Sequence, residues 1–154
     1  MKNKNYYINL ASPKLGTKIL SCSDDFFGDV SRMLKDTKPK FIEDKYDDHG
    51  KWMDGWESRR RRDGGHDWSI IKLGAPGTIH EIEIDTSYFT GNYPPYASVE
   101  GLSANKNPKF NDNWEPILKK IKLKGNKIHK FKVNSSNIKF IRFQIFPDGG
   151  IARL

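Results

Sequence analysis

Residues 51–68 (KWMDGWESRRRRDGGHDW) hold the densest set of side chains that could do chemistry in this sequence. The run contains three tryptophans, four consecutive arginines, four acids and one histidine. Guanidinium groups bind planar anions such as carboxylates, and His66 beside Asp67 suits proton transfer near neutral pH. So charged a run cannot be buried as a core helix or strand, yet its tryptophan rings need a surface to pack on. We therefore interpret residues 51–68 as a functional loop that its tryptophans anchor at the edge of a folded body.

The chain has the size of one domain, because 154 residues can bury a core without metal or disulfide support. We therefore treat residues 1–154 as a single domain. The one cysteine, Cys22, excludes an internal disulfide and a cysteine-based metal site, which fits a reducing compartment. No apolar run approaches the roughly 18 residues that span a bilayer, and the polar start lacks a secretory segment. The sequence thus predicts a soluble cytoplasmic protein with no membrane partner.

The formal net charge of +8 raises the question of a nucleic-acid partner. An excess of Lys and Arg attracts any anion, including a small carboxylate substrate, so the sign of the charge does not identify the partner. The lysines between residues 119 and 139 alternate with apolar residues, which is typical of the solvated face of strands. No nucleic-acid-binding motif accompanies them, so we expect no nucleic-acid partner.

Alternation of apolar and polar residues indicates strands along the second half of the chain. Ile82 and Ile84 are predicted to face a core, while Glu81, Glu83 and Asp85 are predicted to face solvent. Turn residues separate the apolar stretches, most clearly the Gly-Ala-Pro-Gly sequence that ends at residue 77. The expected strands cover residues 68–73, 78–86, 96–102, 117–123, 127–133 and 138–146.

Few helix signals accompany these strands. Residues 30–34 can form one short helical turn with Asp29 or Ser31 as its cap. Strands at hairpin spacing, without alternating helices, favour an all-β antiparallel sandwich. Apolar residues on both faces of the last strands suit two sheets that pack against each other.

Four segments of the chain strongly resemble allantoicase sequences: 51–60 (KWMDGWESRR), 65–68 (GHDW), 85–95 (DTSYFTGNYPP) and 147–154 (PDGGIARL). With shorter matches near the start, the similarity runs in register from about Asn9 to Leu154. The resemblance implies hydrolytic removal of urea from allantoate to leave ureidoglycolate, within purine degradation by way of allantoin. It also implies a jelly-roll β-sandwich similar to galactose-binding domains, in agreement with the strand pattern.

The resemblance also has consequences for partners. Allantoicases usually carry two tandem copies of this domain, whereas this sequence holds one copy, and their final strand continues past the position of Leu154. We therefore expect a truncated last strand, and either a homo-oligomer or pairing with a second allantoicase-repeat chain. The alternative is a non-catalytic ligand-binding or regulatory sandwich, or one half of a two-chain allantoicase.

Allantoate carries one carboxylate and two planar ureido groups on a single carbon, and these groups define what its site must supply. The carboxylate needs a cation, ideally a guanidinium fork. Expulsion of urea needs a general acid at the leaving nitrogen, and a base for the attacking water or for the remaining ureido N–H. The candidates for proton transfer are Glu57, His66, Asp67, Asp85 and Asp148, and those for substrate binding are Arg59, Arg60, Thr86, Asn92, Tyr93 and Arg153.

Several residues of these motifs have structural alternatives. Glu57 is either a catalytic acid or part of an ion pair with a neighbouring arginine. Asp148 is either a site residue or a turn former ahead of two glycines. We expect Arg61 and Arg62 to be solvated or to lie at a subunit interface. Only His66 lies within one of the motifs, so the other three histidines are expected to be surface or structural residues.

No organic cofactor is expected. Histidine together with carboxylates is compatible with a divalent metal ion that acts as a Lewis acid. The spacing of these residues matches no standard ligand motif, so the sequence assigns no metal ligands.

Overall fold

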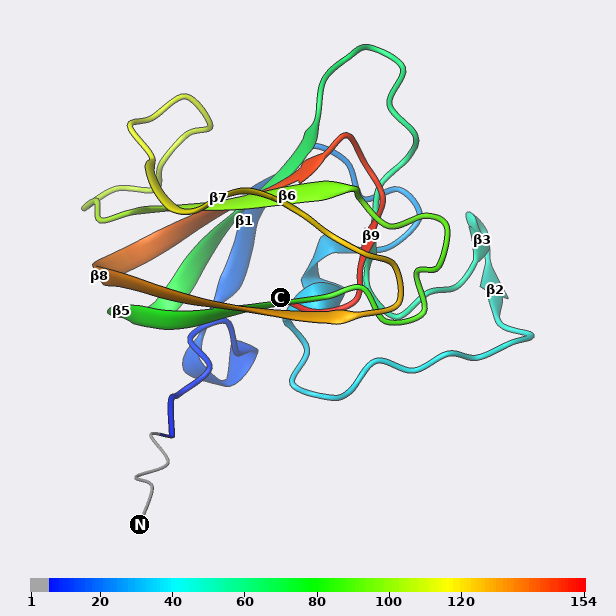
Figure 1. The fold of residues 1–154 in the computed structure, drawn as a ribbon, viewed down its shortest axis with the longest axis horizontal. Coiled ribbons are helices and arrows are strands. Elements are labelled where there is room, and N and C mark those ends of the chain that lie inside the picture. The colour runs from blue at the N-terminus through cyan, green and yellow to red at the C-terminus, as the bar shows by residue number, and fades with distance from the viewer. Residues whose placement is uncertain (1–5) are drawn as a thin grey trace.

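The structure, a computed structural model, describes residues 6–154. It is an all-β sandwich in which the helical elements of the described residues are two short 3-10 turns. Figure 1 shows the strands crossing the molecule and the long loops projecting from them. The elements are η1 (Pro13–Leu15), β1 (Lys18–Cys22), η2 (Val30–Leu34), β2 (Tyr46–Asp47), β3 (Gly50–Lys51), β4 (Trp56–Glu57), β5 (Asp67–Asp85), β6 (Tyr96–Leu102), β7 (Glu115–Lys122), β8 (Ile128–Phe146) and β9 (Gly150–Ile151).

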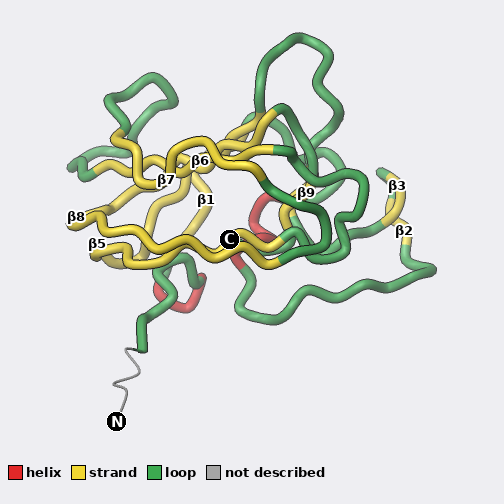
Figure 2. Tube along the Cα trace, in the orientation of Figure 1, coloured by secondary structure: helices red, strands yellow, loops and turns green. Residues whose placement is uncertain are grey.

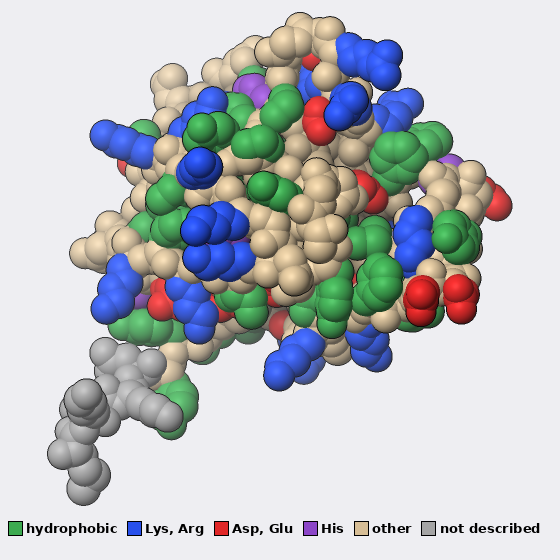
Figure 3. Space-filling model, turned by 45° about the vertical axis from the view of Figure 1, so that its right-hand side comes forward, with side chains coloured by type: hydrophobic (Ala, Val, Ile, Leu, Met, Phe, Trp, Pro, Cys, Tyr) green, Lys and Arg blue, Asp and Glu red, His purple; other side chains and the backbone are tan. Residues whose placement is uncertain are grey.

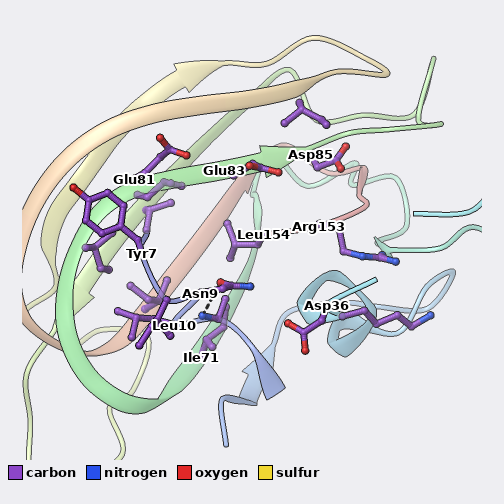
Figure 4. Close-up of a pocket in the computed structure, with 18 of the residues that line it drawn as sticks. Tyr7, Asn9, Leu10, Asp36, Ile71, Glu81, Glu83, Asp85, Arg153 and Leu154 are labelled. Atoms are coloured by element: carbon purple, nitrogen blue, oxygen red, sulfur yellow. Dashed lines mark hydrogen bonds between the residues drawn. The ribbon is translucent and has the colours of Figure 1, made fainter. Parts of the chain in front are cut away.

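The main sheet has five strands in the order β1-β5-β8-β6-β7, and every neighbouring pair is antiparallel. Its central strands β5 and β8 are long and bend sharply, as Figure 4 shows for β5. The first half of β5 pairs with β1 and the second half of β8 pairs with β6, which makes the first layer. The other halves, residues 77–85 and 128–138, pair with each other and form the second layer. The two layers are the predicted antiparallel sandwich.

The bend of β5 occurs where the sequence predicts a turn, at residues 74–77. The strand continues through this stretch, and its register against β8 shifts three times. A Cβ atom on Gly74 would lie 1.9 Å from the carbonyl oxygen of Leu15, so only glycine allows this approach. Both halves of β5 pair with the same strand, β8, so the Gly and Pro residues produce bulges in β5 and do not reverse the direction of the chain. The prediction of two strands was wrong here, and also for 127–133 and 138–146, which form the single strand β8.

The core lies between the two layers. Ile71, Ile141 and Phe143 of the first layer, with Ile82 and Ile84 of the second, are each at most 7% exposed. All five belong to one hydrophobic cluster, which confirms the inward orientation predicted for the two isoleucines of the second layer.

The outward side of the second layer departs from the prediction at one residue. Glu81 and Glu83 are exposed, as expected. Asp85 is only 3% exposed, so its predicted exposure was wrong. It is buried because the segment Ala152–Arg153 lies against it, with the Asp85 N–H donating to the Arg153 carbonyl at 2.9 Å.

The helical turn predicted near the start is η2. Its cap is Asp29, whose carboxylate accepts the Ser31 N–H at 2.8 Å. Met33 and Leu34 are buried in the main hydrophobic cluster, so this turn closes part of the sandwich.

Charged side chains are spread over the face of the molecule that Figure 3 shows. Lys and Arg side chains are dispersed among hydrophobic and neutral ones over the face seen in Figure 3. Within residues 6–154, no helix has the length and apolarity needed to cross a membrane.

Candidate functional site

Loops from distant parts of the sequence meet around β4 and β9, on the side of the sandwich that is richest in loops (Figure 2). In this small sheet Trp56 is opposite Ile151 and Glu57 is opposite Gly150. On its other side, β4 forms a bridge to Gly28, and the Glu57 N–H donates to the Gly28 carbonyl at 3.1 Å. The backbone of Glu57 is therefore held between two neighbouring chain segments.

The turn at residues 148–150 connects this site to the loop that contains Asn92. The Gly150 N–H donates to the Asn92 carbonyl at 2.7 Å. Gly149 has a φ of 136°, and a Cβ atom there would lie 2.8 Å from the same carbonyl oxygen. Since both the φ value and the close approach need glycine, the Gly-Gly pair brings the motifs 85–95 and 147–154 into contact.

Glu57 and Asn92 are the one pair of predicted site residues joined by a side-chain hydrogen bond within residues 6–154. The half-buried carboxylate of Glu57 accepts this bond from the Asn92 amide. Burial raises the pKa of Glu57, and the bond from Asn92 lowers it in part, so the pKa stays above its ordinary value. A carboxyl group of this kind can deliver or accept a proton closer to neutral pH than a solvated glutamate.

Arg59 already binds an internal carboxylate. Its Nε and Nη2 atoms donate to Asp24 Oδ1 at 3.0 and 2.7 Å, and its guanidinium lies 4.9 Å from the centre of the Phe26 ring. Burial opposes ionisation of Asp24, but the bonds from Arg59 hold the pKa of Asp24 below its ordinary value. Arg60 and Arg62 are exposed, and neither makes an ion pair with the described part of the chain.

Arg61 connects Asp63, His66 and Asp67 within the loop 51–68 and joins this loop to Asp148. Its guanidinium donates to Asp63 at 2.7 and 3.0 Å, to Asp67 at 2.9 Å and to the carbonyl of His66 at 3.1 Å. Its backbone N–H donates to Asp148 at 2.8 Å. These partners raise the pKa of Arg61, and the bonds from Arg61 lower the pKa of Asp63. The side chain is 27% exposed and its guanidinium is bound to three groups, so Arg61 is not solvated as the first alternative predicted. The second alternative, a subunit interface, stays a prediction.

His66 and Asp67 are adjacent in sequence but have different surroundings. Asp67 is fully buried, and its Oδ1 accepts from the Ser23 hydroxyl at 2.8 Å, besides the guanidinium contact described above. Its Oδ2 is buried without a partner among residues 6–154. His66 Nε2 lies 2.6 Å from Gln144 Oε1, and its ring stacks on Phe146 with centres 4.5 Å apart. Within the described residues the side chains of His66 and Asp67 share no hydrogen bond, so the structure does not bring them together as an acid–base pair.

Three further candidates hold the loops together. The Asp85 carboxylate accepts the Ser87 N–H at 2.7 Å, which closes a tight turn. Thr86 is fully buried. Its hydroxyl accepts the Lys127 N–H at 3.1 Å and donates to the Lys124 carbonyl at 2.6 Å. Tyr93 packs against the small hydrophobic cluster that contains Phe89. Their predicted roles in catalysis and substrate binding stay predictions.

Arg153 lies at the centre of a saturated polar cluster, here called the Arg153 node, with Asp54, Lys35 and Thr37. Its Nη2 donates to the Asp54 carboxylate at 2.8 Å, its Nε to the Thr37 carbonyl at 2.8 Å, and its Nη1 to the Asp54 carbonyl at 2.7 Å. Lys35 reaches the other Asp54 oxygen at 2.8 Å. Burial opposes ionisation of Asp54, but these bonds hold its pKa below the ordinary value. The anion bound by the Arg153 fork is therefore an internal one.

Trp56 anchors the opening loop. It is fully buried, lies edge-on to Phe143 of the core and donates its indole N–H to the Asp24 carbonyl at 2.8 Å. Trp52 is half-buried beneath Lys45, whose ammonium lies 4.0 Å from the ring centre. These contacts agree with the interpretation of the tryptophans as anchors.

Sequence reasoning missed two partners of the candidate residues. Asp24 binds Arg59, although it lies in the sequence Asp-Asp-Phe-Phe (24–27), outside the four segments that resemble allantoicase. Gln144 holds His66, and it reads in the sequence as one outward residue of a strand. Neither pairing follows from spacing, because each joins residues far apart in the chain.

The residues that the structure describes contain no group of three or more His, Cys, Asp and Glu side chains arranged to hold a metal ion. His66 and the nearby acids are directed to protein partners. The possible divalent metal stays a prediction without an assigned ligand set.

Comparisons with known proteins agree on one family. Residues 8–154 match the family model described as "Allantoicase repeat". The chain is 51% identical over 151 residues to a probable allantoicase of Acinetobacter baumannii (strain ACICU), covering 97% of this chain and 45% of that protein. The crystal structure of allantoicase from Saccharomyces cerevisiae is similar with a TM-score of 0.82 and 34% identity, over 95% of this chain and 46% of that one.

The chain therefore spans about half the length of the curated relatives it matches. A chitosan-binding module from Paenibacillus sp. IK-5 also has a similar fold, with a TM-score of 0.61 and 17% identity over 96% of both chains. At that identity the likeness shows the β-sandwich fold alone.

Proposed function

Because this chain belongs to the allantoicase repeat family, we propose that it takes part in the hydrolysis of allantoate to ureidoglycolate and urea. In this reaction the oxygen of water bonds to the central carbon of allantoate, while the bond from that carbon to one ureido nitrogen breaks. The leaving nitrogen gains a proton and the attacking water loses one. The site must therefore supply groups that transfer protons and groups that orient the ureides.

The observation that carries this proposal is the Glu57–Asn92 pair. Its raised pKa suits Glu57 for delivering a proton to the leaving ureido nitrogen. Asn92 orients that carboxylate and belongs to the loop that the 148–150 turn holds in place. An amide can also bind a ureido group, since it offers both a donor and an acceptor.

Arg60 is the arginine of the opening motif that we assign to the substrate carboxylate. Its neighbours Arg59 and Arg61 bind Asp24 and Asp63 respectively, whereas Arg60 is exposed and makes no ion pair with the described residues. Arg62 is equally exposed and unpaired among these residues, but it lies outside the segment 51–60 that resembles allantoicase. A guanidinium without an internal anion can form a bidentate pair with a carboxylate.

A second candidate is a non-catalytic half of a two-repeat assembly. Two observations favour it. The chain covers only 45% of the length of the Acinetobacter baumannii relative, and the Arg153 guanidinium, a candidate for substrate binding, is already paired with Asp54. In that case the chain stabilises or regulates a second allantoicase-repeat chain that carries the catalytic groups.

A urea-release assay with allantoate tests both proposals. The chain alone, a second allantoicase-repeat chain alone, and the mixture are assayed at equal repeat concentration. Turnover that Glu57→Gln reduces at least a hundredfold supports the catalytic role, and Lys119→Gln on the exposed face of β7 serves as the control variant. Turnover of the mixture that is unchanged by Glu57→Gln supports the non-catalytic half. Absence of turnover in every mixture contradicts both.

A further inference from the structure

Arg60 is flanked on both sides by residues whose backbone is held by a carboxylate from another part of the chain. The Arg59 N–H donates to Asp24 Oδ2 at 2.7 Å, and the Arg61 N–H donates to Asp148 Oδ2 at 2.8 Å. The loop between β4 and β5 projects from the sandwich (Figure 1), yet these bonds fix its backbone next to Arg60. The loop therefore presents the exposed Arg60 side chain from a backbone that is held on both sides.

The Arg61 side chain ties this loop to the start of β5. All three nitrogens of its guanidinium donate to nearby oxygens, Nε and Nη2 to the Asp63 carboxylate and Nη1 to Asp67 Oδ1 and the His66 carbonyl. A Cβ atom on Gly65 would lie 2.7 Å from Nη2, so this residue packs directly against the guanidinium. A lysine ammonium is a point charge and lacks the planar fork that meets these oxygens at once. The contacts therefore depend on an arginine in one orientation.

Asp67 gives Arg61 a fixed point of attachment. It is the first residue of β5, opposite Ile145 of β8, and its N–H donates to the Pro147 carbonyl at 3.0 Å. Its side chain is fully buried and also accepts from the Ser23 hydroxyl at 2.8 Å. Removing a carboxylate ion from water is costly, so a buried ion pair is weak evidence for a gain in stability. What the pair does fix is the place where the Arg61 side chain, and with it the loop, can lie.

The position of the loop matters for the binding of a carboxylate. A bidentate pair needs two parallel N–H···O bonds between the guanidinium and the carboxylate. If the backbone of Arg60 were mobile, binding would also have to order that backbone, and this cost would weaken the affinity. A backbone that is held in advance avoids the cost.

We propose that Arg61 is a positioning residue, which holds the backbone of Arg60 so that the Arg60 guanidinium is oriented for the carboxylate of allantoate. This role rests on the part of the proposed function that assigns Arg60 to the substrate carboxylate. The Arg61 guanidinium is itself bound to Asp63, Asp67 and the His66 carbonyl, so its effect on the substrate passes through Arg60.

A matched pair of substitutions tests this role in the full chain. Arg61→Lys keeps the charge but removes the fork, and Arg62→Lys makes the same change at the exposed neighbour. We expect Arg61→Lys to weaken the binding of allantoate about tenfold by isothermal titration calorimetry, and Arg62→Lys to leave the Kd within about twofold of the parent value. In the active mixture, Arg61→Lys should raise KM by a similar factor and leave kcat nearly unchanged. Equal effects of the two substitutions, or a loss confined to kcat, overturn the role of Arg61.

A double-mutant cycle shows whether Arg61 acts through Arg60. Arg60→Gln removes the guanidinium that is assigned to the carboxylate. If Arg61 only positions this group, adding Arg61→Lys to Arg60→Gln should change the Kd by less than about twofold. A merely structural role would weaken binding by the same factor with or without the Arg60 guanidinium. Additive effects of the two substitutions therefore overturn the role of Arg61.

Hydrogen exchange tests the loop without a substrate. The backbone amides of residues 59 and 61 should exchange about tenfold faster in Arg61→Lys than in Arg62→Lys. The amides of Ile71 and Ile141, in the buried centre of the first layer, should exchange alike in the two variants. Faster exchange of the loop and the core together would show a general loss of stability and overturn the positioning role.

Failure of this role and failure of the proposed function give different results. Urea release together with equal Kd values for Arg61→Lys and Arg62→Lys removes the role of Arg61 and leaves the hydrolysis. Allantoate binding that Arg61→Lys weakens as expected, without urea release in any mixture, contradicts the hydrolysis and supports the role of Arg61. Absence of allantoate binding, both to the chain alone and to the mixture, contradicts both.

Discussion

The Arg153 node and the Glu57–Asn92 pair both come from segments that resemble allantoicase, but they differ in how many of their hydrogen-bonding groups are already used. Every nitrogen of the Arg153 guanidinium donates to a protein oxygen, and Asp54 accepts from two cations. Glu57 is half-buried and has one side-chain partner, which leaves acceptor positions for a ligand. A saturated node holds chain segments together, whereas an incompletely paired carboxylate can do chemistry.

The largest effect on stability is expected from Arg153→Ala. Removing this guanidinium leaves Asp54 buried beside a single lysine, and breaking a buried ion pair typically costs about 3–5 kcal/mol. Urea unfolding followed by circular dichroism measures the loss. Arg59→Ala is the control, because the exposed guanidinium of Arg59 pairs with Asp24 near solvent and should contribute much less to stability. Equal losses in the two variants would show that the distinction between node and site is wrong.

Glu57→Gln should separate function from stability. The amide keeps the shape of the side chain but has no proton to transfer, so urea release by the active mixture should fall about 10²- to 10⁴-fold. The thermal unfolding midpoint should stay close to that of the parent chain, because Glu57 does not anchor the fold. A large fall in the midpoint would place Glu57 among the structural residues instead.

Asp67→Asn is expected to have an intermediate effect on stability. The change removes the charge that Arg61 binds and leaves a buried amide beside Ser23, which typically costs about 1–3 kcal/mol. Asp63→Asn serves as the control, because Asp63 is exposed and binds the same arginine. Chemical denaturation measures both, and a larger loss for Asp63→Asn would contradict the assignment of Asp67 as the buried support.

The smallest effect concerns the pH dependence of stability. Asp54 has a folded-state pKa below 3.8, so its contribution is present above that value and is lost as pH falls through the folded pKa. Glu57 has a folded-state pKa above 4.5, so its contribution is present below that value and is lost as pH rises through the folded pKa. Glu57→Gln should therefore gain stability relative to the parent chain as pH rises above 4.5. A constant difference between the two proteins from pH 4 to 8 would contradict the raised pKa.

The strand pattern determined the fold class because alternation is a local property of the chain. Ile82 and Ile84 face the core as predicted, and η2 forms where a capping aspartate precedes an apolar turn. The bend of β5 was beyond this reasoning. A Gly-Ala-Pro-Gly sequence permits either a turn or a bulged strand, and the choice depends on whether β8 continues as the partner.

The sequence by itself also indicated the segments that the structure brings together around β4 and β9, because the motifs are contiguous and the turn at residues 148–150 needs its glycines. Only the tertiary structure decided what each side chain does there. Arg59 and Arg153 have the same chemistry in the sequence, but Asp24 and Asp54 occupy their forks in the folded chain. Glu57 differs from the buried Asp54 and Asp67 because its carboxylate accepts a bond from the neutral Asn92 amide, whereas theirs are bound to arginines. Partners distant in sequence set these differences, since burial and hydrogen bonding arise only when the chain has folded.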